Sequence, residues 1–173
     1  MARVDADSIA VVPMLADDIG TLRNLLQLYQ YDFSEIEPVA IDRDGRFHQL
    51  DQLEFDHGYF ITADTAIAGF ALVNRQPSRL DDGENVWWMT EFFVMRRYRR
   101  FGVGAHAARH VLERHPGLWE ITETPNNVAA VAFWRNVLAP YGFEEVTFDD
   151  PTCGRRALQR LTIRATGTTS AVL

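Results

Sequence analysis

The 173-residue sequence has little cysteine, few basic residues relative to acidic ones, and no long apolar run. Its single cysteine, Cys153, excludes an internal disulfide framework and favours a reducing compartment, so we expect a cytoplasmic protein. No apolar stretch reaches the length of a membrane span, and residues 1–5 show no signal-peptide pattern. The net charge of −7 argues against nucleic acid as the main partner. We therefore expect neither a membrane nor a nucleic-acid partner.

What remains is a composition typical of one globular domain, with 47% hydrophobic and 24% charged residues. The chain is long enough to bury a core, and it shows no repeat, linker or low-complexity tract. We expect a single domain over residues 1–165. The small, polar segment 166–173 is expected to be a frayed tail.

Apolar patterning predicts the order of the secondary-structure elements. Strands are predicted at residues 8–12, 59–63, 66–74, 87–94, 118–122, 142–148 and 156–164. Helices are predicted after Asp17 or Asp18, from Gly104, and after Asn126 or Asn127, with a weaker one at 47–53. Residues 76–85 read as a loop because they contain Pro77 and Asp82-Gly83.

This order predicts a mixed α/β fold. Residues 59–63 and 66–74 are predicted to form one hairpin, and residues 142–148 and 156–164 a second. The strand–helix–strand unit at 87–122 instead requires one parallel pair with a right-handed crossover. We therefore expect a mostly antiparallel central sheet with one parallel strand pair, flanked by helices.

The most specific chemical signal is the glycine turn Arg99-Arg100-Phe101-Gly102-Val103-Gly104-Ala105. It follows the apolar strand predicted at 87–94 and opens a helix. Free backbone N–H groups and the positive end of a helix dipole favour an anion there. The cluster of Arg96, Arg97, Arg99 and Arg100 fits the same reading, although such runs are more often solvated. We expect one phosphate-bearing ligand at this turn.

One alternative is dinucleotide binding. Residues 102–107 match the pattern G-x-G-x-x-G/A, and Glu123 follows about 20 residues later. A dinucleotide fold needs repeated βαβ units, however, and this sequence shows only one. That alternative is therefore the weaker one.

Two motifs in order resemble the GCN5-related N-acetyltransferases. The first is Arg99-x-x-Gly102-x-Gly104 after Phe92-Phe93-Val94. The second is Asn127-x-x-Ala130-x-x-Phe133-Trp134, followed by Tyr141-Gly142-Phe143. The resemblance is good over residues 86–148 and implies an acyl-CoA N-acyltransferase-like fold in which the parallel pair is splayed.

The resemblance implies acetyl-CoA as co-substrate and direct transfer of its acetyl group to a primary amine in a ternary complex. The pyrophosphate would sit on backbone N–H groups of the turn, and Val94 N–H would serve the acetyl carbonyl. Asn127, which also fits a helix N-cap, would face the pantetheine arm. The implied cofactor-binding residues are Phe93, Val94, Arg99, Arg100, Phe101, Gly102, Val103, Gly104, Ala105, Asn127 and Trp134.

Two residues are candidates for proton transfer. Glu91 stands in the apolar strand, where relatives often carry a carboxylate, and it would serve as general base; the alternative is a solvent-facing or arginine-paired residue. The family's usual acid is a tyrosine at the position of Trp134, whose indole cannot replace it. Tyr141 is the candidate acid, with a core or turn aromatic as the blander reading.

The acceptor is expected to be a small cationic amine, because aromatics and carboxylates follow the first helix. These candidates are Tyr29, Asp32, Phe33 and Glu35. His106 and His110 lack a third ligand, so no metal is expected. A second class of function, an acyl-CoA sensor or scaffold without turnover, stays open, as does pairing with a second copy of the chain.

Overall fold

The computed structural model describes residues 5–47, 54–80, 83–150 and 154–165. Cys153, most of the helix predicted at 47–53 and the predicted tail 166–173 lie outside these residues. The strands are β1 (Ile9–Pro13), β2 (His57–Ala63), β3 (Ala66–Pro77), β4 (Asn85–Val94), β5 (Gly117–Glu123), β6 (Glu144–Asp150) and β7 (Gly154–Ile163). The helices are α1 (Ile19–Phe33), α2 (Val103–Arg114) and α3 (Val128–Leu138), with short 3₁₀ turns between elements.

The seven strands form one sheet in the order β1-β2-β3-β4-β5-β7-β6. Every neighbouring pair is antiparallel except β4 and β5, which are parallel and joined through α2. A mostly antiparallel sheet with one parallel pair is what the sequence predicts, although it gave no strand order. The observed sheet confirms the expected fold class and gives no second βαβ unit among the described strands, so the dinucleotide alternative is wrong.

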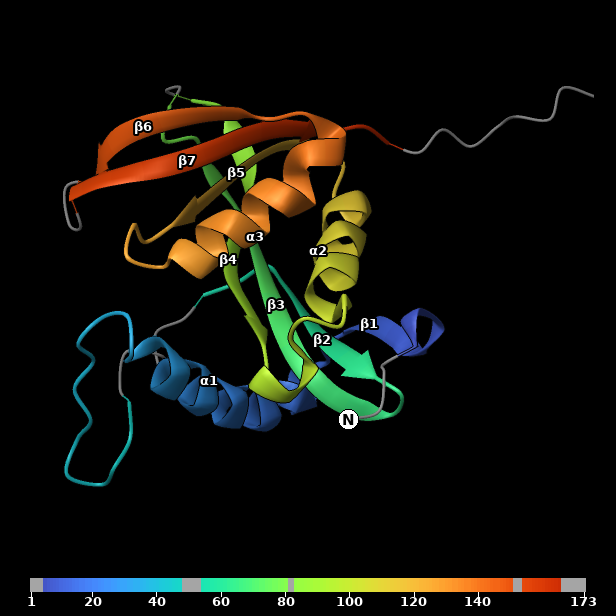
Figure 1. Ribbon diagram of the computed structural model, residues 1–173, viewed down its shortest axis with the longest axis vertical. Coiled ribbons are helices and arrows are strands. Elements are labelled where there is room, and N and C mark those ends of the chain that lie inside the picture. Colours follow the sequence, from blue (N-terminus) through green and yellow to red (C-terminus); the bar gives the residue numbers. More distant parts are fainter. Residues whose placement is uncertain (1–4, 48–53, 81–82, 151–153, 166–173) are drawn as a thin grey trace, which may run out of the picture.

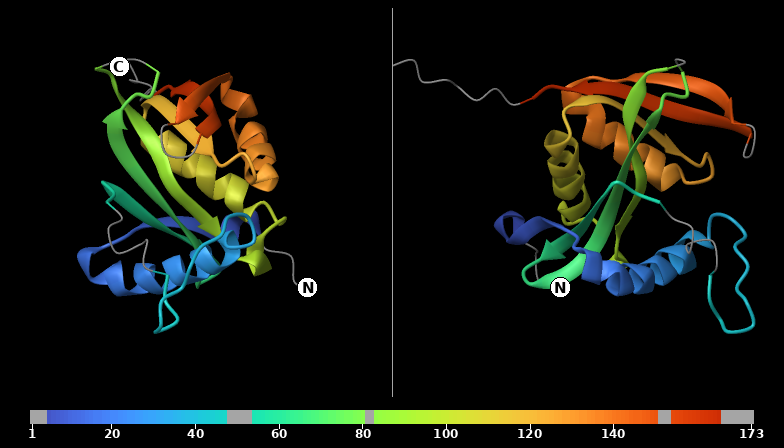
Figure 2. Two further views of the ribbon diagram at one scale, coloured as in Figure 1. Left: turned by 90° about the vertical axis from the view of Figure 1, so that its left-hand side faces the viewer. Right: turned by 180° about the vertical axis from the view of Figure 1, so that it is seen from behind.

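The helices cover the two faces of the sheet differently (Figure 1, Figure 2). On one face, Leu22, Leu25 and Leu26 of α1 pack on a cluster that includes Phe70 and Phe93. On the other face, α2 and α3 bury a larger core. Its helix residues include Ala107, Ala108, Val111, Leu112, Trp134, Val137 and Leu138. The spacing of these apolar positions is helical, which is why the sequence predicted the helices correctly.

The parallel pair opens along its length. Only Trp87↔Trp119 and Trp88↔Glu120 are paired between β4 and β5. Beyond these residues the two strands point apart (Figure 1). β4 also carries a bulge, because Leu72 pairs with Glu91 and Val73 with Met89, which leaves Thr90 as the extra residue. We call the unpaired stretch between residues 91–94 of β4 and 121–123 of β5 the open end.

The element boundaries depart from the sequence prediction mainly at one place. β3 continues to Pro77 and β4 begins at Asn85, whereas residues 76–85 were predicted to be a loop. Gln76 pairs with Val86 and Pro77 with Asn85 at the end of the hairpin. The proline sits at the last position of its strand, where a missing N–H costs little.

Candidate active site

The glycine turn opens α2 with its backbone N–H groups unpaired. Gly102 is the N-cap of α2 and has φ +84°, and Arg100 also has a positive φ of 66°. The first helical backbone bond runs from His106 N–H to the Gly102 carbonyl. Among the described residues, no backbone bond uses the N–H groups of residues 100–105 as donors. A Cβ added at Gly102 would meet nothing within 4 Å, so space lies beside the turn. These features fit a pyrophosphate.

Arg99, by contrast, is engaged by protein groups. Its Nε donates to the carbonyl of Val94 at 2.7 Å, and its Nη2 donates to the carboxylate of Asp32. Arg96 donates to the other oxygen of Asp32 and to Glu35. The role predicted for the Arg99 side chain at the cofactor therefore stays a prediction, and the structure shows a link to α1 instead.

The end of β4 presents backbone groups to the open end. Met95 N–H donates to the Ala68 carbonyl at 2.8 Å, and the antiparallel register pairs Phe93 with Phe70 and Val94 with Gly69. Because bonding alternates along an antiparallel pair, the N–H and C=O of Val94 point away from β3. Its carbonyl meets Arg99 as described, so its N–H faces the open end. The backbone of Phe93 bonds within the sheet, and by the same alternation Phe92 is the other residue that faces outward.

Gly69 allows β3 to approach this stretch closely. A Cβ on Gly69 would lie 2.0 Å from the carbonyl oxygen of Phe93 and 3.0 Å from Cα of Val94. Real Cβ atoms do not approach backbone atoms so closely, so only glycine fits. The sequence analysis missed this residue, because nothing in its neighbours distinguishes it from any other strand glycine.

Glu91 lies half-buried on β4 at the start of the open end. Burial raises the pKa of its carboxyl to about 7, while the Tyr29 hydroxyl that faces it acts in the opposite direction. No described basic residue forms an ion pair with it. A carboxyl that titrates near neutral pH is suited to accept a proton from an amine.

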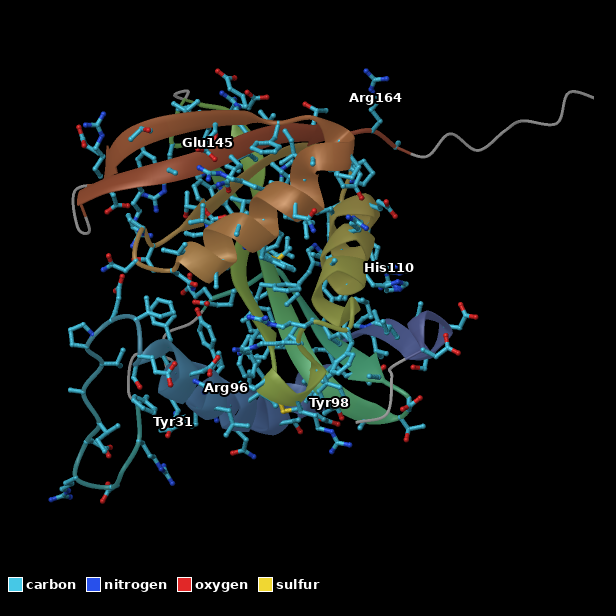
Figure 3. The ribbon with its side chains drawn as sticks, viewed as in Figure 1. Tyr31, Arg96, Tyr98, His110, Glu145 and Arg164 are labelled. Atoms are coloured by element: carbon cyan, nitrogen blue, oxygen red, sulfur yellow. The ribbon has the colours of Figure 1, made fainter. Side chains whose placement is uncertain are left out.

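The four predicted acceptor residues fall into two groups. Tyr29 and Phe33 lie one turn apart on α1 with ring centroids 5.8 Å apart, and Tyr29 also packs on Phe93 at 5.7 Å. The pKa of Tyr29 is raised by burial and by the nearby Glu91 and Glu37. Asp32 and Glu35 instead turn toward Arg96, which Figure 3 shows beside α1. Of the four, Tyr29 is the residue that faces Glu91.

Two further polar residues border the same region, and the sequence analysis did not single them out. Thr124 follows β5 and donates its hydroxyl proton to the carboxylate of Glu37, which follows α1. Glu37 also acts on the pKa of Tyr29, so the segment after α1 reaches both sides of the open end. The segment after α1 shows no periodic pattern, so the sequence did not predict this contact.

Asn127 and Trp134 occupy opposite environments on α3. The side-chain oxygen of Asn127 accepts from Ala130 N–H at 3.0 Å, as an N-cap does. Among the described residues its Nδ2 has no hydrogen-bond partner, so this amide group can still meet a ligand. Trp134 is 5% exposed and packs edge-on against Phe92 at 5.3 Å. Its contact with the cofactor stays a prediction, and its packing is that of a core residue.

Tyr141 lies at the far end of α3 from Asn127. Its hydroxyl donates to the Glu113 carboxylate of α2 at 2.8 Å. Burial and this carboxylate raise the pKa of Tyr141 to about 12, which makes it a weaker acid than a free tyrosine. The placement argues against the predicted acid role, because the side chain is committed to a contact between two helices.

Glu123 ends β5 and is 6% exposed. Burial raises its pKa to about 7, and the Gln159 amide donates to one carboxylate oxygen at 3.2 Å. The other oxygen is buried without a hydrogen-bond partner among the described residues. The Glu123 carboxyl is therefore turned toward Gln159 of β7.

Other features of the described surface lie away from the open end. His106 and His110 are stacked at 6.2 Å, and no group of three or more metal-ligating side chains was found among the described residues. A surface cavity of about 410 Å³ lies by the end of β1 and the start of β2, lined by residues such as Met14, Phe55 and Tyr59. None of the described helices has the length and apolar character needed to cross a membrane.

Comparisons with known proteins agree with this geometry. The family model "Acetyltransferase (GNAT) family" matches residues 21–138. A GNAT acetyltransferase from Streptococcus agalactiae is 12% identical, with a TM-score of 0.65 over 89% of this chain and 95% of that one. Arabidopsis thaliana Naa50 in complex with the bisubstrate analogue CoA-Ac-MVNAL is 15% identical, with a TM-score of 0.58 over 90% and 99%. An agmatine N-acetyltransferase is 12% identical, with a TM-score of 0.61 over 91% and 100%. No curated protein sequence matches.

Proposed function

Because the chain belongs to the GNAT acetyltransferase family, and is thereby an acetyl-CoA-dependent N-acetyltransferase, we propose that it acetylates a small cationic amine by direct transfer. Both substrates would be bound together at the open end. The observation that carries the proposal is the Glu91 carboxyl, which has a pKa of about 7 and lies on the strand whose Val94 N–H faces the same gap.

Acetyl-CoA fits the residues that border the glycine turn. The unpaired N–H groups of residues 100–105 would hold its pyrophosphate, aided by the dipole of α2. The Asn127 amide would meet the pantetheine arm. When bound, acetyl-CoA supplies an acetyl group activated as a thioester, with a thiol as its leaving group.

Glu91 would accept the proton of the amine, and Val94 would stabilise the negative charge that develops on the acetyl oxygen. An amine attacks only when neutral, and Glu91 would accept its proton directly or through one water molecule. The Val94 N–H would donate to the acetyl oxygen as negative charge develops there. Such fixed donors typically contribute about 3 kcal/mol of transition-state stabilisation.

The preference for a small cationic acceptor comes from this chain's own side chains. Glu91 and Glu37 have no cationic partner among the described residues, and the Tyr29 ring, which packs on Phe33, lies close to both. Carboxylates and aromatic faces together favour an ammonium group. The neighbours in fold differ in what they bind, since one is an agmatine N-acetyltransferase and another is in complex with the bisubstrate analogue CoA-Ac-MVNAL.

A thiol-release assay with a panel of amines tests the proposal. The panel would include small diamines, guanidino amines, neutral amines and short peptides with free N-termini. We expect release above the hydrolysis background with small cationic amines first. Binding of CoA without any release would support the sensor alternative. The sequence contains 17 arginines and no lysine, so acetylation of the protein's own lysine side chains adds no background to the assay.

The variant Glu91→Gln gives the test its mechanistic control. Its kcat should fall about 100-fold near neutral pH, and the acid limb of the pH profile near pH 7 should disappear. Unchanged kcat would remove Glu91 from the mechanism. We further propose a cytoplasmic setting, on the strength of the single cysteine.

A further inference from the structure

A chain of charged contacts joins the end of α1 to the end of β4. Arg99 donates through Nη2 to Asp32 and through Nε to the Val94 carbonyl, the latter at 2.7 Å. Arg96 donates to the second oxygen of Asp32 and, at 2.9 Å, to Glu35. The Asp32 side chain is only 18% exposed, although both arginines are much more open. One partly buried carboxylate therefore organises two arginines that stand directly before Gly102.

These contacts act on a peptide unit that is important to the site. The peptide between Val94 and Met95 is held at both ends, because its carbonyl meets Arg99 and its N–H donates to the Ala68 carbonyl at 2.8 Å. Holding this plane fixes the ψ angle of Val94 and the direction in which the chain leaves β4. The next residues lead through 96–98 into the turn whose N–H groups are unpaired.

The electrostatics favour a permanent contact over an exchangeable one. Burial would raise the pKa of Asp32, but the hydrogen bonds from Arg99 and Arg96 prevail and lower it. The carboxylate is thus charged at neutral pH and has both oxygens occupied. An acceptor ammonium would have to displace an arginine from Asp32 to bind there.

We infer that Asp32 is a positioning residue, which acts through Arg99 on Val94 and the glycine turn, and not a ligand of the acceptor. The inference rests on the proposed function. Although Asp32 belongs to α1, we expect it to affect the binding of CoA, because its contact with Arg99 joins α1 to the glycine turn. Removing the Asp32 charge should loosen the turn and weaken CoA binding while leaving acceptor binding intact.

The test measures CoA affinity by calorimetry without any acceptor, alongside the two KM values. Asp32→Asn should weaken CoA binding about fivefold to tenfold and raise the KM of acetyl-CoA in proportion. The KM of the acceptor should stay within about twofold. The variant Arg99→Gln and the double variant should show equal affinities, because Asp32 acts through Arg99.

Matched variants keep the test decisive. Glu145→Gln breaks a comparable pair, in which Arg135 donates at 2.6 and 2.8 Å, and Glu145 lies at the other end of the molecule from Arg96 (Figure 3). It should bind CoA as the wild type does. Asp32→Glu keeps the charge and should recover part of the affinity, and it replaces Asp32→Asn if that variant does not fold.

The contrary results are distinct. Wild-type affinity in Asp32→Asn, or additive losses in the double variant, would overturn the inference and leave the proposed function standing. A rise in acceptor KM alone would return Asp32 to the acceptor site. A wild-type protein that fails to bind CoA would overturn both proposals.

Discussion

Where β4 begins, it is paired with β5 and Trp87 packs among rings; where β4 ends, Glu91 adds a carboxyl group and the backbone has no partner strand on the β5 side. At the first place, Trp87 lies 4.5 Å from the His115 ring and 6.2 Å from Trp119, and its indole N–H donates to the Pro116 carbonyl. The Tyr59 hydroxyl and a His115 ring nitrogen are 2.8 Å apart. At the second place, Glu91 faces Tyr29 and the Val94 N–H has no strand partner.

This contrast shows how the molecule can hold an open strand pair. The aromatic cluster fixes β4 to β5 where they are paired, so separation further along costs no loss of register. The polar groups that a continuous sheet would bury unpaired are left where substrates can satisfy them. Burial lowers the pKa of His115 to about 4, with the nearby His57 and Arg114 as further causes, and raises the pKa values of Glu91 and Glu123 to about 7. The two ends therefore respond to pH in opposite directions.

The largest effect is expected from a methyl group that forces β3 and β4 apart beside the open end. Gly69→Ala would place a Cβ 2.0 Å from the Phe93 carbonyl oxygen, so β3 or β4 must shift. We expect a loss of about 3 kcal/mol in the free energy of unfolding, measured by chemical denaturation, together with loss of activity. Gly20→Ala in α1 is the control, since its Cβ meets nothing within 4 Å, and it should stabilise by about 0.5 kcal/mol. Equal stabilities would contradict the close approach.

The opposed pH responses can be separated by two substitutions. Between pH 6.5 and about 4 the unfolded chain binds a proton at His115 that the native chain refuses, so His115 lowers stability as pH falls through this window. Between pH 4.5 and about 7 native Glu123 holds a proton that the unfolded chain has lost, so Glu123 lowers stability as pH rises.

Relative to wild type, His115→Gln should remove the acid-side loss and Glu123→Gln the loss toward neutral pH. Each substitution should change the free energy of unfolding by about 1–2 kcal/mol after allowance for solvent screening. Chemical denaturation at a series of pH values from 4 to 8 measures this change. Parallel stability profiles for wild type and both variants would show that the two ends do not differ in this way.

A smaller effect tests the partner of Glu91. The Tyr29 hydroxyl acts to lower the pKa of Glu91, so Tyr29→Phe should move the acid limb of the activity profile to higher pH. Activity at pH 7 should fall about twofold to threefold, because less of the base is ionised. A profile that moves to lower pH, or not at all, would mean that the hydroxyl does not act on Glu91.

The smallest effect is expected away from the open end. Tyr141→Phe removes only the 2.8 Å bond to Glu113, so kcat should change by less than about twofold. The free energy of unfolding should fall by about 1 kcal/mol. A large drop in kcat with an unchanged fold would restore Tyr141 as the general acid.

The sequence predicted the fold well because its signals are local. Apolar spacing in α1, α2 and α3 and the single strand–helix–strand unit suffice to predict the three helices and the one parallel strand pair. The glycine turn was likewise predictable as a strand-to-helix turn, since Gly102 stands between β4 and α2 and takes a positive φ at the N-cap of that helix.

The polar contacts could not be predicted in the same way. Asp32 meets Arg99 across 67 positions, and Thr124 meets Glu37 across 87, so neither pair leaves a spacing that a pattern could reveal. The bond from Tyr141 to Glu113 was unpredictable for the same reason, because the two residues lie 28 positions apart. Side-chain pairing across elements depends on the folded geometry and not on neighbours in the chain.

The alternation of backbone bonding along β4 also bears on how its amides exchange with solvent. Phe93 is bonded into the sheet, whereas Phe92 and Val94 on either side of it face the gap between the parallel strands. Neighbouring amides on one strand thus differ in protection from deuterium uptake, and a ligand in the gap slows only the outward-facing ones. Deuterium uptake at Phe92 and Val94, compared with uptake at Phe93, therefore reports whether a ligand occupies the gap.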